Sequence, residues 1–191
     1  MQLNRAARLS AFAVATAAVH CASPSAPSSA TPASVAPAPG HAAVTAAPDF
    51  SASELAGKIF RLSDHVGKEV ILLDFWATYC EPCKSEFPHL RAIYDKEKEK
   101  GLLVVGISMD GPETAADVSA FVRRFALNFP IVIDEDSRIA SLYNPKKSMP
   151  LSVIIDRAGR IAVVREGYNP GDEALVALDV DRALAMPRAN K

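Results

Sequence analysis

The sequence predicts an α/β fold in which a central mixed β-sheet carries helices on both faces. Residues 69–77 and 102–110 are two almost unbroken apolar runs, which are typical of strands buried on both faces of a sheet. A segment with helical spacing follows each run, at residues 81–100 and 113–127. Strands that alternate with helices along the chain favour such a layered architecture.

The remaining elements of the sheet follow toward the C-terminus. Residues 129–135 predict a strand, and residues 137–143 predict a short helix. Residues 151–167 predict a β-hairpin that bends near Gly159, and residues 172–185 predict a closing amphipathic helix.

An N-terminal β-hairpin extension is predicted ahead of the first buried strand. Residues 57–68 hold a short apolar stretch between glycines, and Gly67-Lys68 is a turn signal. We therefore expect this hairpin to precede the central sheet and to pack on it.

The first 21 residues have the layout of a secretory signal. Two arginines and no acidic residue occupy residues 1–10, and a short apolar run follows at 11–19. That run is too short to span a bilayer as a permanent helix. We expect export to the periplasm or cell envelope, and the alternative is an ordinary N-terminal helix that packs on the domain.

Residues 22–48 are almost entirely Ala, Ser, Pro and Thr, a composition that cannot offset the entropy of ordering. We expect a disordered, semi-stiff spacer between the signal and a folded domain at 49–187.

Cys21 stands at the start of this spacer, where lipidation would tether the chain to a membrane. The stretch around it resembles a bacterial lipobox only loosely, because Ala18 and His20 depart from the pattern. The alternative is that Cys21 leaves with a cleaved signal.

Bulk composition excludes several classes of function. A formal net charge of -1 and the lack of a basic stripe give no support for nucleic-acid binding. Three cysteines are too few for a disulfide-stapled scaffold. No glycine-rich nucleotide loop occurs, so we expect no bound cofactor and no metal, and electrons would come from another dithiol. We also expect a monomer.

The stretch WATYCEPCKSEF, residues 76–87, carries the candidate chemistry. Cys80 follows a buried strand and precedes a helix, where unpaired N–H groups and the helix dipole favour a thiolate. Pro82 suits the first helical turn, because its missing N–H is not needed there. Cys83 lies three residues on, on the same face and within disulfide reach.

The cysteine pair is compatible with three interpretations. A structural zinc site needs about four ligands, and His65 and His89 are isolated in the sequence. A static crosslink between Cys80 and Cys83 would close a loop too short to constrain the unfolded chain. A redox-active pair at a strand-to-helix turn fits all the features.

Residues 72–90, LLDFWATYCEPCKSEFPHL, resemble the active-site segment of the thioredoxin superfamily. CEPCKSEFP is especially similar to the TlpA/ResA-like branch of exported thiol–disulfide oxidoreductases. The similarity continues through residues 104–110 and 148–161 and covers nearly all of residues 50–185. It implies a thioredoxin fold with an N-terminal extension and an element inserted after the first βαβ unit.

The resemblance also implies roles for individual residues. Cys80 matches the attacking cysteine, Cys83 the resolving cysteine, and Glu86 the active-site glutamate of the ResA type. Pro150 matches the cis-proline of the family, so we predict a cis Met149-Pro150 bond that exposes the Met149 backbone to a substrate strand.

The sequence departs from the family around the pair. Tyr79 stands where tryptophan is usual, and Ser148 and Leu151 stand where glycine and threonine are common. We expect the substrate-binding rim to include Tyr79, Trp76, Glu81 and Pro82. The departures therefore bear on substrate preference more than on the chemistry.

Asp74 lies inside the first apolar strand, where burial should raise the pKa of its carboxyl. Its position matches the buried acid of classical thioredoxins. We interpret Asp74 and Glu86 as proton acceptors near Cys83. The alternatives are a hydrogen-bonded structural acid for Asp74 and a solvated helix residue for Glu86.

The dipeptide between the cysteines suggests the direction of electron flow. Glu81 places a negative charge near the Cys80 thiolate and disfavours it, which favours the disulfide and hence a reductant. The chain is thus interpreted as a reductase of disulfides in exported proteins, apocytochrome c among them, and a membrane thiol carrier would re-reduce it.

Two other functions remain open. A peroxiredoxin-like thiol peroxidase is suggested by residues 104–110 and 129–135, although the spacing of Thr78 and Cys80 does not fit its Thr-x-x-Cys arrangement. A copper-delivery protein would need a histidine close to the thiolate pair.

Overall fold

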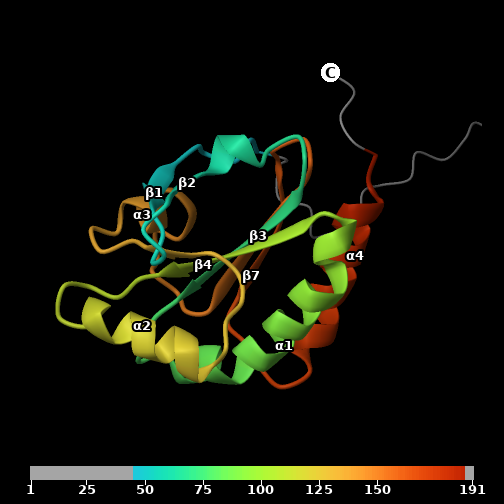
Figure 1. Cartoon of the computed structure of the whole chain (residues 1–191). Helices are drawn as coiled ribbons and strands as arrows, with labels where there is room; N and C mark the ends of the chain where they lie inside the picture. The colour runs from blue at the N-terminus through green and yellow to red at the C-terminus, as the bar shows by residue number, and fades with distance from the viewer. Residues whose placement is uncertain (1–44, 188–191) are drawn as a thin grey trace, which may run out of the picture. The chain divides into compact units, whose positions relative to one another are not determined.

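The computed structural model describes residues 45–187 (Figure 1). The predicted signal, Cys21 and residues 22–44 of the predicted spacer lie outside the described residues. The elements in chain order are β1 (Ser51–Ser53), β2 (Ile59–Arg61), η1 (Leu62–Asp64), β3 (Val70–Trp76), α1 (Glu81–Glu97), η2 (Lys98–Lys100), β4 (Leu102–Ser108), α2 (Ala115–Arg124), β5 (Ile131–Ile133), α3 (Arg138–Tyr143), β6 (Leu151–Ile155), β7 (Ile161–Glu166) and α4 (Asp172–Ala185).

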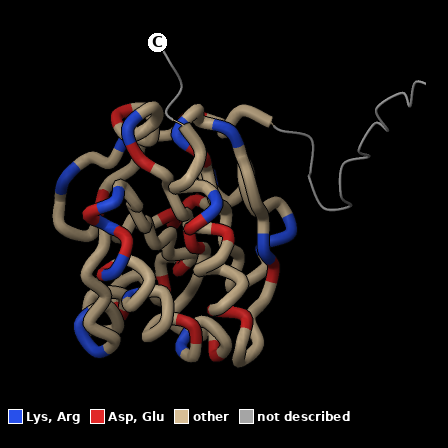
Figure 2. The backbone as a smooth tube through the Cα atoms, turned by 90° about the vertical axis from the view of Figure 1, so that its right-hand side faces the viewer, with Lys and Arg blue, Asp and Glu red and all other residues tan. Residues whose placement is uncertain are grey.

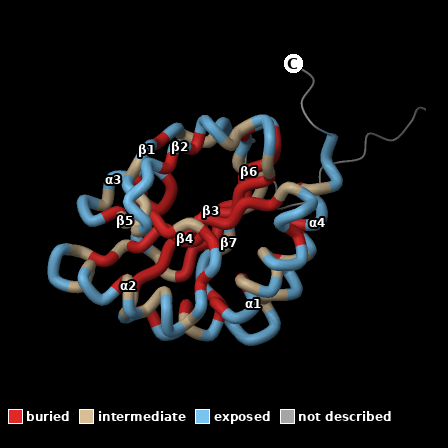
Figure 3. The backbone as a smooth tube through the Cα atoms, viewed as in Figure 1, coloured by how far each residue is buried: buried red, intermediate tan, exposed pale blue. Residues whose placement is uncertain are grey.

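Five strands form the central sheet in the order β5-β4-β3-β6-β7. β3 is parallel to β4 and antiparallel to β6, and all seven residues of both β3 and β4 are buried. Figure 3 shows these two strands as the buried centre of the domain. The predicted mixed sheet is therefore confirmed, and its two apolar runs are strands with no solvent-facing side, as their composition requires.

Helices and loops cover the sheet on both faces. Leu72 and Trp76 point into the core cluster that also contains residues of α1, α2 and α4. Leu73 and Phe75 point the other way, into a cluster with α3, β2 and η1. Successive side chains of a strand alternate between faces, so one short run supplies both cores.

The predicted N-terminal hairpin exists, but its strands and turn differ from the prediction. β1 pairs with β2, and Ser51 lies opposite Arg61. The turn lies at residues 54–58, where Gly57 has a φ of 82°. The sequence of β1 is Ser-Ala-Ser, which has no alternation of bulky apolar and polar residues. These residues form a strand because their backbone pairs with β2, and their composition alone would not predict one. Gly67, at a φ of 87°, instead turns the chain from η1 into β3.

Two short segments pair with the edge strands of the sheet. Leu55 N–H donates to Ile131 O at 2.8 Å, beside the hairpin, and so joins β5. Ala47 N–H donates to Gly159 O at 2.8 Å, just ahead of β7. Such contacts cover backbone groups that an open edge would leave unpaired.

Charged residues of both signs are interspersed along the described chain (Figure 2). Among the helices that the structure describes, none is both long enough and apolar enough to cross a membrane.

Candidate active site

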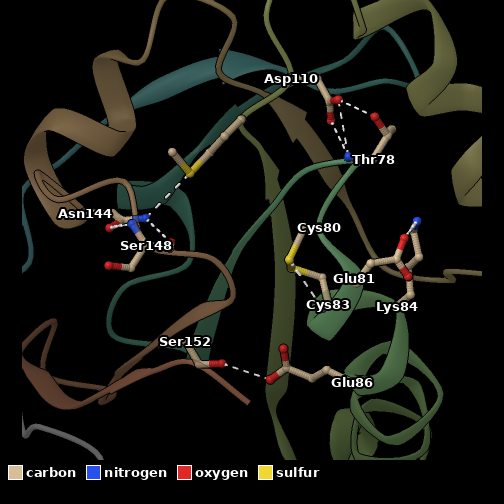
Figure 4. The surroundings of a disulfide bond; sticks show 11 residues. Thr78, Cys80, Glu81, Cys83, Lys84, Glu86, Asp110, Asn144, Ser148 and Ser152 are labelled. Carbon is tan, nitrogen blue, oxygen red and sulfur yellow. Dashed lines mark hydrogen bonds and ion pairs between the residues drawn. A yellow bond between two sulfur atoms is a disulfide. The ribbon is translucent and has the colours of Figure 1, made fainter. Parts of the chain in front are cut away.

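Cys80 and Cys83 form a disulfide at the N-terminus of α1, with their Cα atoms 5.4 Å apart (Figure 4). Cys80 is the N-cap of this helix, and its Sγ accepts the Cys83 N–H at 3.3 Å. Pro82 occupies the first turn, as predicted. The three residues between the end of β3 and Cys80 thus place one sulfur against free helical N–H groups, which favour negative charge there.

The two sulfurs differ in access to solvent. Cys80 retains 6% of its surface, whereas Cys83 retains none. Cys80 is therefore the cysteine of the pair that an incoming group can reach. Both belong to an apolar cluster with Trp76 and Phe87. A buried, apolar surrounding opposes ionisation and so partly offsets the effect of the helix.

Asp110 holds the loop that leads to Cys80, and sequence reasoning missed it. It is fully buried just after β4, and its carboxyl accepts the Thr78 hydroxyl at 2.6 Å and the Thr78 N–H at 3.1–3.2 Å. Ser108 Oγ donates to the same carboxyl at 2.8 Å. The sequence signal that could have identified Asp110 is the position of this acid just after the buried strand β4, which pairs with the strand that precedes Cys80.

The predicted cis Met149-Pro150 bond is confirmed. Pro150 is buried directly ahead of β6, and Met149 packs against the cluster that contains both cysteines.

Asn144, which sequence reasoning also missed, fixes the loop that precedes Met149 and Pro150. Its Oδ1 accepts the Ser148 N–H at 2.9 Å, and its Nδ2 donates to Ser148 O at 2.7 Å.

Asp74 and Glu86 are buried on the same side of the sheet. Asp74 has no exposed surface, and neither of its carboxyl oxygens has a hydrogen-bond partner among the described residues. Glu86 lies one turn after Cys83 on α1 and points toward Ser152, whose Oγ donates to Oε1 at 3.5 Å (Figure 4). Ser152 is also the cross-strand partner of Asp74.

Burial raises the pKa of both carboxyls. For Glu86 the charge of Asp74 adds to that rise, and Asp172 contributes less. Ser152 moderates the pKa of both acids, although its hydroxyl meets hydrogen-bond geometry only with Glu86. The predicted rise for Asp74 is therefore seen, and Glu86 is not a solvated helix residue.

A cavity of about 260 Å³ lies beside Glu86 and Ser152. It is also lined by Arg165 of β7, Tyr168 of the loop after β7, and Asp172 at the start of α4. Since one water occupies about 30 Å³, the space admits several water molecules. Glu86 therefore borders a polar space, while Asp74 does not line it.

The structure corrects the rim that the sequence predicted. Trp76 has no exposed surface and packs against Phe87 and Phe121, with ring centroids 5.2 and 4.9 Å away. Because Gly106 lacks a side chain, the indole fits against β4; a Cβ there would lie 2.9 Å from Trp76 Nε1. Trp76 is therefore a core residue and does not line the surface at Cys80, whereas Tyr79 is 59% exposed.

The charge argument from Glu81 does not hold in the folded protein. Its carboxylate forms an exposed ion pair with Lys84, one turn further along α1. The lysine offsets the negative charge near Cys80, so Glu81 gives no net preference for the disulfide.

The two histidines considered as ligands are engaged elsewhere. His65 Nδ1 lies 2.6 Å from Glu69 Oε2, and its ring stacks on Phe60. His89 stacks with Tyr168 at a centroid distance of 6.3 Å. Within residues 45–187, no three His, Cys, Asp or Glu side chains are grouped as a metal site would require.

Comparison with known proteins agrees with this geometry. The sequence model of the AhpC/TSA family matches residues 44–164. The thiol-disulfide oxidoreductase ResA of Bacillus cereus is 39% identical to this chain over 115 residues. The matched region makes up 60% of this chain and 64% of the ResA protein, which is less than two thirds of that protein's length.

Solved structures show the same fold. One assigned to a DsbE thiol:disulfide interchange protein of Chlorobium tepidum is 32% identical, with a TM-score of 0.69, over 74% of this chain and 97% of that one. A secreted Mycobacterium tuberculosis disulfide oxidoreductase, homologous to Escherichia coli DsbE, is 25% identical with a TM-score of 0.60, over 70% and 95%. The thioredoxin-like fold and the TlpA/ResA-like resemblance are thus confirmed.

The raised pKa of Asp74 predicts a distinctive pH dependence of stability. The unfolded chain loses this proton near pH 4, whereas the native chain keeps it to higher pH, so native stability falls as pH rises through that window. Asp74→Asn removes this loss. Its free energy of unfolding relative to wild type should rise between pH 4 and pH 7, by about 1.4 kcal/mol per unit of pKa difference.

Urea unfolding of the oxidised protein at both pH values checks this prediction. Asp95→Asn is the control, because hydrogen bonds from Lys98 and Asn128 lower the pKa of that exposed carboxyl. Its titration therefore lies mainly below pH 4, and its stability relative to wild type should change little between pH 4 and pH 7. A difference between Asp74→Asn and wild type that is independent of pH would contradict the assignment.

Proposed function

The chain belongs to the AhpC/TSA family, and on that premise we propose that it is a thiol–disulfide oxidoreductase that works through Cys80 and Cys83. The observation that carries the proposal is the disulfide at the start of α1, with the accessible sulfur as the N-cap and its partner fully buried. The proposal is also supported by the similarity to ResA, a thiol-disulfide oxidoreductase, and to DsbE, a thiol:disulfide interchange protein.

The reaction begins with the reduced pair. The Cys80 thiolate attacks one sulfur of a substrate disulfide, the substrate S–S bond breaks, and a mixed disulfide forms as one substrate thiolate leaves. Cys83 then loses its proton and attacks the Cys80 sulfur. The second substrate thiolate leaves, the Cys80–Cys83 bond forms, and two electrons have passed to the substrate.

Asp74 and Glu86 serve as proton acceptors for Cys83 in this proposal. Burial raises the pKa of Asp74 to about 7, where a carboxyl can both take up and release a proton near neutral pH. The pKa of Glu86 is raised further, to about 9, in part by the charge of Asp74, so Glu86 accepts a proton most readily while Asp74 is itself protonated. Glu86 is the better placed to return the proton to solvent, because it borders the polar cavity beside Ser152.

We propose that the net direction is reduction of substrate disulfides. The support is the apolar surrounding of both sulfurs, which disfavours the thiolate and hence stabilises the oxidised enzyme. Glu81 does not support a direction, because Lys84 compensates its charge.

The proposed substrates are disulfides of exported proteins, with the cysteine pair of apocytochrome c as one member of that class. Export is supported by the signal-like layout of residues 1–21, and one structural relative is described as secreted. A membrane thiol carrier would return electrons to the pair, and lipidation of Cys21 would keep the two partners close.

Thiol peroxidase chemistry is less well supported. The Thr78 hydroxyl donates to Asp110 rather than serving the Cys80 sulfur, and Cys80 is paired with a cysteine one helical turn away. No observation favours copper delivery over disulfide exchange.

Trapping tests the proposed function. Cys83→Ser leaves Cys80 able to attack but removes the resolving thiol, so mixed disulfides with exported proteins should accumulate in cells. They should disappear on reduction and be absent from the Cys80→Ser, Cys83→Ser double variant, which controls for adducts on Cys21. Equal adduct formation by the double variant would overturn the assignment.

Glu86→Gln tests the proton acceptor. It should slow resolution of a mixed disulfide by Cys83 by about 100-fold, the low end of general acid–base effects. Formation of the mixed disulfide, measured in a Cys83→Ser background, should be unchanged. Glu99→Gln, on the exposed turn η2, is the matched control. Stopped-flow kinetics with a model disulfide gives both rates, and equal slowing of both steps would exclude the role.

A further inference from the structure

Two loops meet at the candidate site, and neither is fixed by regular secondary structure. One joins β3 to α1 and carries Cys80; the other joins α3 to β6 and carries Met149. We propose that Asp110 and Asn144 are positioning residues that, together with Met109, hold these two loops in one arrangement. This inference rests on the proposed function and assigns residues to it that the cysteine motif does not contain.

Asp110, which follows β4, fixes the first loop through hydrogen bonds to Thr78. Thr78, two residues before Cys80, gives both its hydroxyl and its N–H to the Asp110 carboxyl. Ser108 Oγ donates to that carboxyl at 2.8 Å, so three donors converge on one fully buried acid. Charge-assisted hydrogen bonds of this kind are stronger than neutral ones and hold a loop in one conformation.

Asn144 fixes the second loop in a similar way. It is 1% exposed and makes both a donor and an acceptor hydrogen bond to the backbone of Ser148, two residues before Pro150. Ser148 Oγ in turn donates to Glu166 on β7 at 2.5 Å. The amide therefore closes the loop ahead of Met149, and an alanine would remove the partners of two part-buried backbone groups of Ser148.

Met109 connects the two anchors. Its N–H donates to Trp76 O at 2.7 Å, at the end of the strand that leads to Cys80. Its Sδ accepts a long hydrogen bond from Asn144 Nδ2 at 3.5 Å. Figure 4 shows Asp110 with Thr78 on one side of the disulfide and Asn144 with Ser148 on the other. The adjacent residues 109 and 110 thus contact both loops from the end of β4.

The roles of Asp110 and Asn144 can be tested separately. A small reagent that reacts with Cys80 depends only on the first loop, which Asp110 holds, and not on the second loop, which Asn144 holds. A protein substrate must contact both the Cys80 sulfur and the Met149 loop, whereas iodoacetamide needs only the sulfur. Loosening the second loop should therefore impair protein turnover selectively. Loosening the first loop should impair both reactions, because it moves the attacking sulfur itself.

The experiment uses the full chain, with insulin as the protein disulfide and dithiothreitol as electron donor. Asn144→Ala should lower kcat/KM for insulin by about tenfold, the scale of modest misplacement, and should leave the alkylation rate of Cys80 by iodoacetamide within about twofold. Thr78→Val, which removes only the hydroxyl given to Asp110, should lower both rates. Alkylation is assigned to Cys80 by peptide mapping.

Asn128→Ala, which removes an exposed amide that donates to Asp95, is the control and should match wild type in both assays. Thermal unfolding of each variant establishes that it is folded at the assay temperature. Unchanged insulin turnover by Asn144→Ala, or equal loss of turnover and alkylation, would overturn the positioning role. Failure of the wild-type chain to reduce insulin would instead overturn the proposed function, and this inference with it.

Discussion

The structure depends on where one sulfur is placed: at the first turn of a helix that follows a completely buried strand. β3 lies in the middle of the sheet, paired on both sides, so its end at Trp76 is fixed by the whole core. Only four residues separate that end from α1. Cys80 therefore has little freedom, and its Sγ meets the Cys83 N–H that the helix leaves unpaired. Pairing with Cys83 and access to solvent both follow from this placement.

Burial acts in two opposite ways around this sulfur. The apolar cluster that includes Trp76 and Phe87 stabilises the domain, and it also weakens the preference of the helix terminus for a thiolate. The same side of the sheet holds Asp74 and Glu86, which are costly to bury as charges and therefore retain their protons to higher pH. Two buried acids on one side of the sheet are costly to stability as charges, and the proposed proton transfer during disulfide exchange would account for them.

The sequence predicted what depends on periodicity and on the cysteine motif. Fully apolar runs identify β3 and β4, and the motif leads to the disulfide and to the cis Met149-Pro150 bond. It failed where tertiary pairing decides: Ser51–Ser53 is a strand only because it pairs with Ile59–Arg61. It also failed for side chains whose partners are distant in the chain. Asp110 is 32 residues from Thr78, and nothing local shows that Trp76 is enclosed or that Lys84 neutralises Glu81.

The most direct test is equilibration of the purified chain with glutathione buffers of defined ratio, read by tryptic mapping of the Cys80–Cys83 peptide. The account predicts one reversible two-electron transition, the same from either direction, with a potential below that of the glutathione couple, since burial favours the disulfide. A pair that never opens or closes reversibly, or one that remains reduced in oxidising buffer, would contradict it.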